Sequence, residues 1–423
     1  MMTGGSSGGS GAAVAAYTAT IAVTEDTSGS TNTPAARNHL FGYDPPKFHY
    51  PNGGNPSLTV RNDQLGVNAR NMEDIIEFDK AVLGTADAHA TAKAYVDGLA
   101  NSDIKIGCSN VYYNYSTPTQ AIKNYYSKAM SVLKDAGFSF VDECQDTNPH
   151  EVVPDPDGFH RSAVWFKELE NFIVNGLGLT DLNPWDVLLN GYYDFGTTLS
   201  MGWMFENEDE GCTLINKDSE ENTEAFLGPI PAGRSDAYND YFDMYDVDLI
   251  MGPSQYCDKV LWTEDIGGSV GANDGCDGGR ATAGCMFACH SPGILGSLDK
   301  TFTKAKFVVP IGLTEIGEPF TIQFMSRAGP RNPTMPASEW VFDEEGPKTW
   351  NLEELYMVKR IADTLNAAGM GRADAPFNEM SGLDLSEDST TSTPPSESDA
   401  IATFSFGWVA AVVAASLVAI SFV

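Results

Sequence analysis

The sequence contains few positive charges. Its 423 residues include 25 lysines and arginines against 58 aspartates and glutamates, which gives a formal net charge of −33 and a pI near 4.3. Such a chain repels nucleic acid and anionic membrane surfaces, and this charge argues against both surfaces as partners. The acidic clusters at 206–210 and 218–224 are typical of solvated loops. Calcium binding is the weaker alternative, because no Asp-x-Asp-x-Asp-Gly loop is present.

Basic residues are absent after Arg372. Residues 386–400 are rich in Ser, Thr, Pro and acids, and the uncharged residues 401–423 are long enough to cross a bilayer. Without a basic flank, this tail fits a GPI-attachment signal, with a single-span anchor as the alternative. No signal peptide is visible, and residues 114–116 form a glycosylation sequon. We expect a membrane-attached glycoprotein whose body lies outside the cytosol.

Cysteine is present in an odd number. Four of the seven cysteines fall in the glycine-rich stretch 257–289. Cys285, Cys289 and His290 have a spacing that suits zinc, but no second ligand pair accompanies them. A disulfide-stapled loop is the better interpretation for a secreted protein. We therefore predict neither a metal nor a cofactor.

Two glycine-rich segments near the start of the chain carry serines. Residues 4–10 read Gly-Gly-Ser-Ser-Gly-Gly-Ser, and residues 26–30 read Asp-Thr-Ser-Gly-Ser. Two such turns can place hydroxyls and backbone N–H groups around one carbonyl. A flexible linker is disfavoured, because residues 10–16 predict a short helix capped by Ser10 and residues 18–24 alternate like a strand.

A second interpretation of the first segment is a nucleophile elbow. Residues 5–9 match Gly-x-Ser-x-Gly, which in α/β-hydrolases follows a strand and works with a histidine base. Here no strand precedes the motif, and none of the six histidines stands in a supporting motif. We reject the elbow.

The two serine segments resemble those of the amidase signature family of serine hydrolases. Further segments resemble that family in the same order along roughly residues 3–370. They are Asp-x-x-Gly-x-x-Ala-Arg with its following helix (63–78), a Tyr-Asp strand ending in Pro (245–253) and a closing hairpin (310–327). Five ordered segments make the resemblance specific.

The resemblance implies different catalytic roles for the serines. Ser30 matches the nucleophile, and Ser6, after a cis peptide bond, matches the serine that relays its proton to a lysine base. The implied oxyanion hole consists of Thr27, Ser28, Gly29 and Ser30. Asp26 and Ser7 are implied as supporting residues. The implied substrate is a small-molecule amide.

Three positions depart from the family pattern. The family lysine lies upstream of the first serine segment, but only three residues precede Gly4. Ser28 stands where glycine is usual, and Asn32 where an arginine is common. We favour an N-terminally truncated copy of an amidase that hydrolyses carboxamide C–N bonds, inactive as this fragment. The alternative is a non-catalytic, membrane-anchored amidase-like protein. The amidotransferase component that acts on glutaminyl- or glutamyl-tRNA shares the signature but is disfavoured by the apolar tail, the cysteines and the acidity.

The remaining sequence predicts an α/β fold. Helices are expected at 72–83 with Asn71 as cap, and at 119–136, 165–177 and 352–368. Residues 104–141 indicate a strand–helix–strand unit, and strands 307–311 and 320–325 are expected to pair. The resemblance implies one mixed sheet with helices on both faces, missing its N-terminal part. We divide the chain into an amidase-like domain (1–372), a linker (373–400) and an anchor (401–423).

Overall fold

The computed structural model of the chain describes residues 4–26, 29–46, 49–51, 55, 63–108, 120–141, 170–181, 205–208, 211–214, 234–254, 304–313, 317, 319–327 and 352–372. Several predicted features lie outside this part. They are Thr27 and Ser28, the sequon, the zinc alternative at 285–290, the linker and the apolar tail. The described residues include the first serine segment, Ser30 and the elements that surround them.

Eight of the described strands form one mixed sheet in the order β1-β3-β2-β9-β10-β8-β4-β5. The strands are β1 (Ile21–Asp26), β2 (Phe41–Asp44), β3 (Gln64–Ala69), β4 (Lys105–Gly107), β5 (Ser139–Phe140), β8 (Leu249–Pro253), β9 (Lys306–Leu313) and β10 (Pro319–Ser326). Along this spatial order, each neighbouring pair from β1 to β8 is antiparallel. Strand β4 runs parallel to both β8 and β5. A separate hairpin joins β6 (Phe205–Glu208) to β7 (Gly211–Leu214). The predicted mixed sheet is confirmed.

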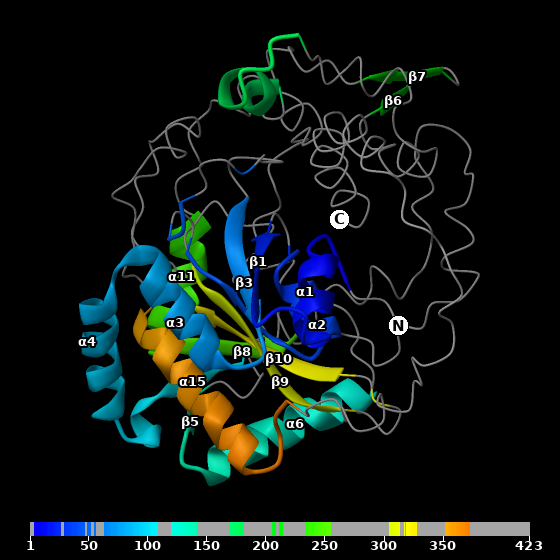
Figure 1. Cartoon of the computed structure of the whole chain (residues 1–423). Coiled ribbons are helices and arrows are strands. Elements are labelled where there is room, and N and C mark those ends of the chain that lie inside the picture. Colours follow the sequence, from blue (N-terminus) through cyan, green and yellow to red (C-terminus); the bar gives the residue numbers. More distant parts are fainter. Residues whose placement is uncertain are drawn as a thin grey trace, which may run out of the picture.

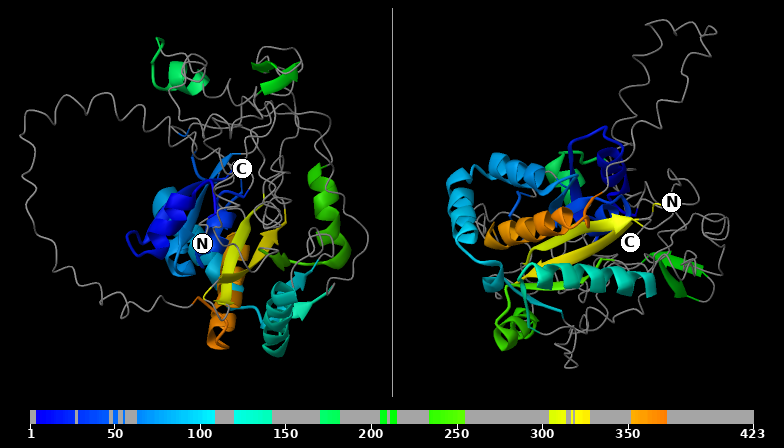
Figure 2. Two further views of the ribbon diagram at one scale, coloured as in Figure 1. Left: turned by 90° about the vertical axis from the view of Figure 1, so that its right-hand side faces the viewer. Right: turned by 90° about the horizontal axis from the view of Figure 1, so that it is seen from below.

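Segments from the two ends of the chain meet in the middle of this sheet. β2 pairs with β9, so that Gly42 lies opposite Val308 and Asp44 opposite Lys306. The strands drawn in blue and yellow therefore lie side by side (Figures 1 and 2). The predicted pairing of 307–311 with 320–325 is confirmed by the β9–β10 ladder.

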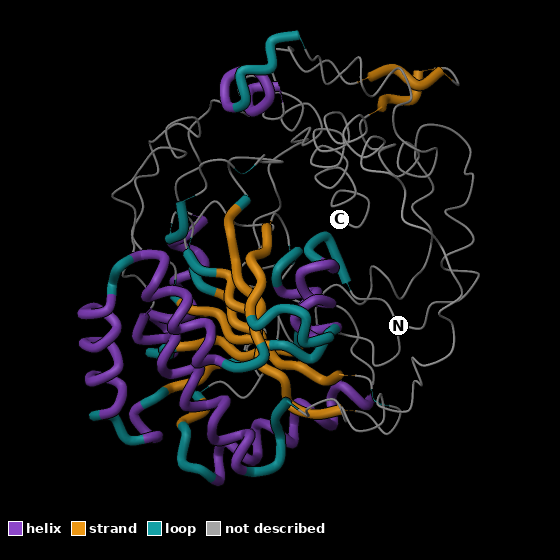
Figure 3. The backbone as a smooth tube through the Cα atoms, viewed as in Figure 1, coloured by secondary structure: helices purple, strands orange, loops and turns teal. Residues whose placement is uncertain are grey.

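Helices cover both faces of the sheet (Figures 1 and 3). On one face α1 (Gly8–Ala15) and α2 (Asn32–Arg37) pack on Val308 of β9 through a small apolar cluster. We call this the α1/α2 face. The main core on the opposite face takes side chains from α3 (Met72–Leu83), α4 (Ala86–Asp97), α6 (Gln120–Asp135) and α15 (Leu352–Ala367).

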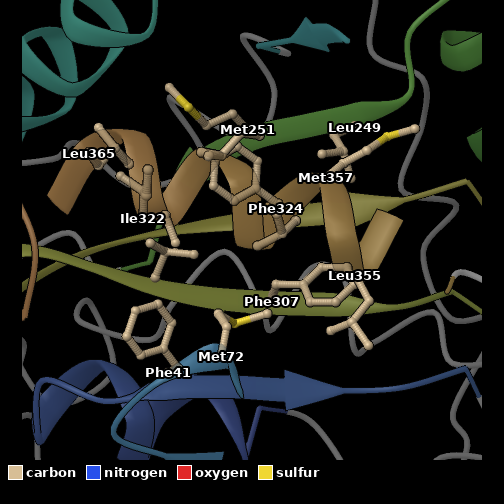
Figure 4. Close-up of a cluster of buried hydrophobic side chains, with 14 of the residues drawn as sticks. Phe41, Met72, Leu249, Met251, Phe307, Ile322, Phe324, Leu355, Met357 and Leu365 are labelled. Carbon is tan, nitrogen blue, oxygen red and sulfur yellow. The ribbon is translucent and has the colours of Figure 1, made fainter. Parts of the chain in front are cut away.

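The main core is built on alternate residues of β9 and β10. Phe307, Ile322 and Phe324 are buried against Leu355 and Met357 of α15 (Figure 4). Because successive strand residues point to opposite faces, Lys306, Val308 and Gln323 are directed to the α1/α2 face. The apolar residues of these strands are core residues, as expected.

The predicted helices agree with the structure in most places. α3 begins after Asn71, whose side chain accepts a hydrogen bond from the Asp74 N–H, and α6 and α15 match the predicted 119–136 and 352–368. The predicted cap at Ser10 is wrong. α1 begins at Gly8, and the Ser10 hydroxyl instead donates to the Val23 carbonyl at 3.0 Å. Of 165–177 the structure describes a short π-helical turn, η2 (Phe172–Gly176).

Two further findings concern Cys108 and the described helices. Cys108, directly after β4, is disulfide-bonded. Among the described helices, which also include α11 (Arg234–Tyr245) and η1 (Asn101–Asp103), none combines the length and apolar character of a membrane span.

Candidate active site

The first serine segment is fastened to the elements on both sides of Ser30. Gly4 has a φ of +75°, and a Cβ there would lie 2.9 Å from the Thr33 carbonyl carbon. The Ser7 hydroxyl donates to the Glu25 carbonyl and accepts from the Glu25 N–H, both at 3.1 Å. Between these ties the Gly5–Ser6 peptide bond is cis, as the family resemblance implies. The two serine segments are thus neighbours in the fold.

A buried carboxylate organises the turn that carries Ser30. Asp26, the last residue of β1, accepts hydrogen bonds from the Gly29 N–H through Oδ1 and from the Thr31 N–H through Oδ2, both at 2.8 Å. We call Asp26 with residues 29–31 the Ser30 turn. Gly29 has a φ of +123°, a backbone conformation that favours glycine. Asp26 therefore fixes the backbone immediately before and after Ser30.

The Ser30 hydroxyl is buried and unbonded. Ser30 is 1% exposed, and its Oγ has no hydrogen-bond partner in the described part of the chain. A buried hydroxyl without a partner costs about 1–3 kcal/mol, so such groups are rare unless they have a function. In this structure the Ser30 hydroxyl therefore makes no hydrogen bond to Ser6, the serine predicted to relay its proton.

Two further buried polar groups share the α1/α2 face with Ser30. Neither side-chain amide atom of Asn32 has a hydrogen-bond partner within the described residues. The same holds for Oε1 of Gln323, which lies opposite Val308 in the sheet and so on the same face. These amides offer both donors and acceptors to a polar ligand.

A buried lysine approaches the Ser30 turn from the far end of the sequence. Lys306 is 1% exposed, and its Nζ lies 2.5 Å from Asp44 Oδ2 and 3.7 Å from Asp26 Oδ1. Gln64 supports the group by donating from Nε2 to Asp44 Oδ1. Sequence reasoning missed Lys306, although a charged residue at the start of an apolar strand was a signal for it.

A second polar cluster lies in the main core. Asp79 of α3 binds Nε2 of His49 at 2.5 Å, Nε2 of His89 at 2.8 Å and the Tyr50 hydroxyl at 2.7 Å. All three groups are buried next to the core residue Tyr43 or α15, on the face opposite α1 and α2. No local sequence motif supports His49 or His89 as a base. The structure supplies a carboxylate partner for both, but on the wrong side of the sheet to serve Ser30.

The other residues predicted for the oxyanion hole and its support are Gly29, Thr27, Ser28 and Ser7. The Gly29 N–H, expected to face an oxyanion, donates to Asp26 instead. Thr27 and Ser28 lie outside the described residues. Ser7 acts as a tie to β1, in line with a supporting role. The described residues contain no cluster of three or more His, Cys, Asp or Glu side chains placed to hold a metal ion.

Comparison with known proteins finds a family match over the first part of the chain. The sequence model of the Amidase family matches residues 1–155. The A-type subunit of glutamyl-tRNA(Gln) amidotransferase from Campylobacter jejuni is 33% identical over 150 residues, 36% of this chain and 31% of the relative. Its counterpart from Methanococcus maripaludis is 31% identical over 141 residues, 33% of this chain and 32% of the relative. The match therefore spans about a third of the length of these curated relatives.

Solved structures extend the likeness in fold over most of the chain. An amidase family protein from Bacillus anthracis superposes with a TM-score of 0.51 at 17% identity, covering 86% of this chain and 61% of that one. A 6-aminohexanoate cyclic dimer hydrolase in complex with substrate gives a TM-score of 0.52 at 16% identity, covering 88% and 70%. Residues 1–155 therefore match the Amidase family, and the described structure has the α/β fold seen in solved amidase-family proteins.

Proposed function

We propose that this protein hydrolyses carboxamide C–N bonds, with Ser30 as the nucleophile and Ser6 as its proton relay. The observation that carries the proposal is the buried, unbonded Oγ of Ser30, held in a turn that Asp26 fixes on both sides. Its support is the amidase-family match over the same residues and the hydrogen bonds of Ser7 that hold the first serine segment beside this turn.

The reaction requires two transfers at Ser30. Its Oγ attacks the carbonyl carbon, the C–N bond breaks and the amine leaves with a proton relayed through Ser6. Water then hydrolyses the resulting ester and restores the hydroxyl. Backbone N–H groups around Thr27, Ser28 and Ser30 would stabilise the oxyanion. As proton acceptor we propose the lysine that the family resemblance places upstream of Gly4.

We propose a small amide as the substrate class. The buried polar atoms of Asn32 and Gln323 share the face of Ser30 and suit an amide or carboxyl group more than a long apolar chain. The curated relatives are named as subunits of a glutamyl-tRNA(Gln) amidotransferase. The net charge of −33 disfavours tRNA as a substrate of this chain.

The test is covalent labelling of the purified protein with a fluorophosphonate probe, followed by peptide mapping. We expect the probe on Ser30, no labelling of Ser30→Ala, and labelling of Ser6→Ala slowed by about 10²–10⁴-fold because the proton relay is lost. Ser10→Ala is the matched control, since the Ser10 hydroxyl binds only the Val23 carbonyl in the described structure. It should be labelled at the native rate.

Two samples distinguish a base within residues 1–423 from a base that lies upstream of them. One is the protein isolated from its own cells, and the other is the chain of residues 1–423. If only the native protein reacts, an upstream residue supplies the base. Full labelling of Ser30→Ala, or a native protein that resists the probe, contradicts the proposed activity and favours a non-catalytic protein. Copurification with tRNA or with other proteins of a complex would favour an amidotransferase.

We also propose that the protein is attached to a membrane with its body outside the cytosol. The uncharged residues 401–423 and the disulfide at Cys108 support this location. The same location is expected under the alternative function, a non-catalytic anchored protein. That alternative is supported by Asn32 in place of arginine. Detergent partitioning before and after phosphatidylinositol-specific phospholipase C tests the anchor. Release by the enzyme indicates GPI, detergent partitioning that persists after treatment indicates a spanning segment, and a protein that never enters the detergent phase contradicts attachment.

A further inference from the structure

Lys306 is a buried charged residue whose surroundings are set by the pairing of strands in the sheet. It begins β9, lies opposite Asp44 of β2 and Met325 of β10, and is directed to the α1/α2 face with Val308. Burying an ammonium group is costly unless carboxylates or other acceptors surround it. Here two buried carboxylates lie within ion-pair distance, one on β2 and one at the end of β1, although Lys306 Nζ makes no hydrogen bond within the described residues.

The two carboxylates have different connections. Asp44 lies 2.5 Å from Lys306 Nζ and also accepts from Gln64, which pairs with Asp26 in the β1–β3 ladder. Asp26 lies 3.7 Å from Lys306 Nζ and binds the N–H groups of Gly29 and Thr31. A continuous chain of charged and hydrogen-bonded groups therefore runs from β9 to the backbone on either side of Ser30.

We propose that Lys306 is a positioning residue for the Ser30 turn. Its ammonium group, anchored on Asp44, holds the Asp26 carboxylate in the orientation that fixes the Gly29 and Thr31 N–H groups and thereby aims Ser30 Oγ. The expected effect of Lys306 on Ser30 reactivity rests on the proposed function. The expected effect of Lys306 on the backbone of the Ser30 turn does not depend on that function. Because its Nζ is ion-paired to both carboxylates, we assign Lys306 no proton transfer.

The position also accounts for Asn32. The family resemblance implies an arginine there, beside the nucleophile, and this chain has a neutral side chain instead. Lys306 brings a positive charge to the same turn from another strand. The competing interpretation is that Lys306 serves Asp44 alone, since that contact is the shorter one. The two interpretations differ in what happens to the Gly29 and Thr31 amides when Lys306 is replaced.

The experiment is residue-resolved amide hydrogen exchange on the full chain with Lys306→Met, which keeps most of the length of the side chain and removes its charge. We expect the Gly29 and Thr31 amides to exchange at least about tenfold faster, while amides of α15 keep their native rates. Lys306→Arg should restore native exchange, because guanidinium can bind both carboxylates. Lys359→Met is the matched control, because Lys359 also bridges two carboxylates, Glu73 and Asp363, each at 2.7 Å.

Ser30 labelling by the fluorophosphonate probe gives the second measurement. We expect Lys306→Met to slow the maximal labelling rate by about 10²-fold, as misplacement of a reacting group does, without changing the probe concentration at half-maximal rate. Lys306→Arg should recover most of that loss. A native protein that resists the probe contradicts the proposed function only, and the exchange data then decide the role of Lys306.

Two results would overturn the positioning role. One is native exchange of Gly29 and Thr31 in Lys306→Met, which would leave Lys306 as the partner of Asp44 alone. The other is an equal acceleration of α15 amides, which would make Lys306 a general stabiliser. If Lys306→Met does not fold, the same measurement is made on Lys306→Met with Asp44→Asn, which leaves one uncompensated carboxylate in place of two.

Discussion

At the scale of single residues, the Ser30 turn depends on a position without a side chain. Thr31 is buried, and its Oγ1 lies 2.7 Å from Thr24 Oγ1. It packs so closely on Gly66 of β3 that a Cβ there would lie 2.5 Å from Thr31 Oγ1 and 2.9 Å from the Tyr43 carbonyl oxygen. Any larger residue at Gly66 must push Thr31 away from the sheet.

Gly66→Ala should therefore impair both stability and reactivity. We expect the free energy of unfolding to fall by about 1–3 kcal/mol, the usual cost of overpacking, and Ser30 labelling to slow because Thr31 shifts. Urea unfolding and probe kinetics measure the two effects. Gly9→Ala is the control, since a Cβ at Gly9 meets nothing within 4 Å. A Gly66→Ala protein with native unfolding and labelling would show that the turn adapts.

The sequence predicts the local part of this site but not its distant part. Ser30, Ser6 and Asp26 lie in two short segments, and the resemblance of these segments to the amidase signature family implies their roles. The partnership of Lys306 with Asp26 depends on the β2–β9 register, which brings residues from opposite ends of the chain together. No local pattern contains that register, because it is fixed by the whole sheet.

At the scale of elements, helix α3 was predictable because its start carries its own signal. Asn71 is extended, its side chain accepts from the Asp74 N–H at 2.7 Å, and Gly84 ends the helix in the left-handed conformation. α1 lacks such a signal. Its preceding residue, Ser7, makes no capping bond and binds β1 instead, so the predicted cap at Ser10 lies three residues after the observed cap position.

Replacing the cap of α3 should give a measurable loss. We expect Asn71→Ala to lower the free energy of unfolding by about 1 kcal/mol, because the Asp74 N–H loses its acceptor at the helix start. Urea unfolding monitored by circular dichroism is the measurement. Asn124→Ala, at an exposed position within α6, should leave stability unchanged or slightly higher. Equal effects at both positions would argue against a role for the cap.

At the scale of the whole molecule, Asp79 joins parts of the chain that are far apart in sequence. It binds His49 and Tyr50 after β2 and His89 of α4, and His89 Nδ1 lies 3.2 Å from the hydroxyl of Tyr356 in α15. Burial raises the pKa of Asp79, but hydrogen bonds from His49 and His89 outweigh it and lower that pKa from 3.8 to about 2. The folded state therefore favours the ionised carboxylate.

This shift makes the fold sensitive to acid. Because the pKa of Asp79 is lower in the folded state, its contribution of about 2 kcal/mol is fully present above pH 4 and is lost as the pH falls towards 2. We expect Asp79→Asn to be less stable than the native protein at pH 7 and to lose less stability between pH 4 and 2. Urea unfolding at several pH values tests this. Asp87→Asn, exposed on α4, should follow the native curve, and an unchanged acid limb in Asp79→Asn would contradict the assignment.

The strand order also dictates when, during synthesis, the Ser30 turn becomes enclosed. β9 lies between β2 and β10, so Asp26 and Asp44 leave the ribosome long before Lys306 does. Until β9 is synthesised, β2 lacks its neighbour in the sheet, and an unpaired strand edge of this kind can associate with other chains. Ser30 is therefore synthesised early, but the contacts of the Ser30 turn are completed only after Lys306 has been synthesised.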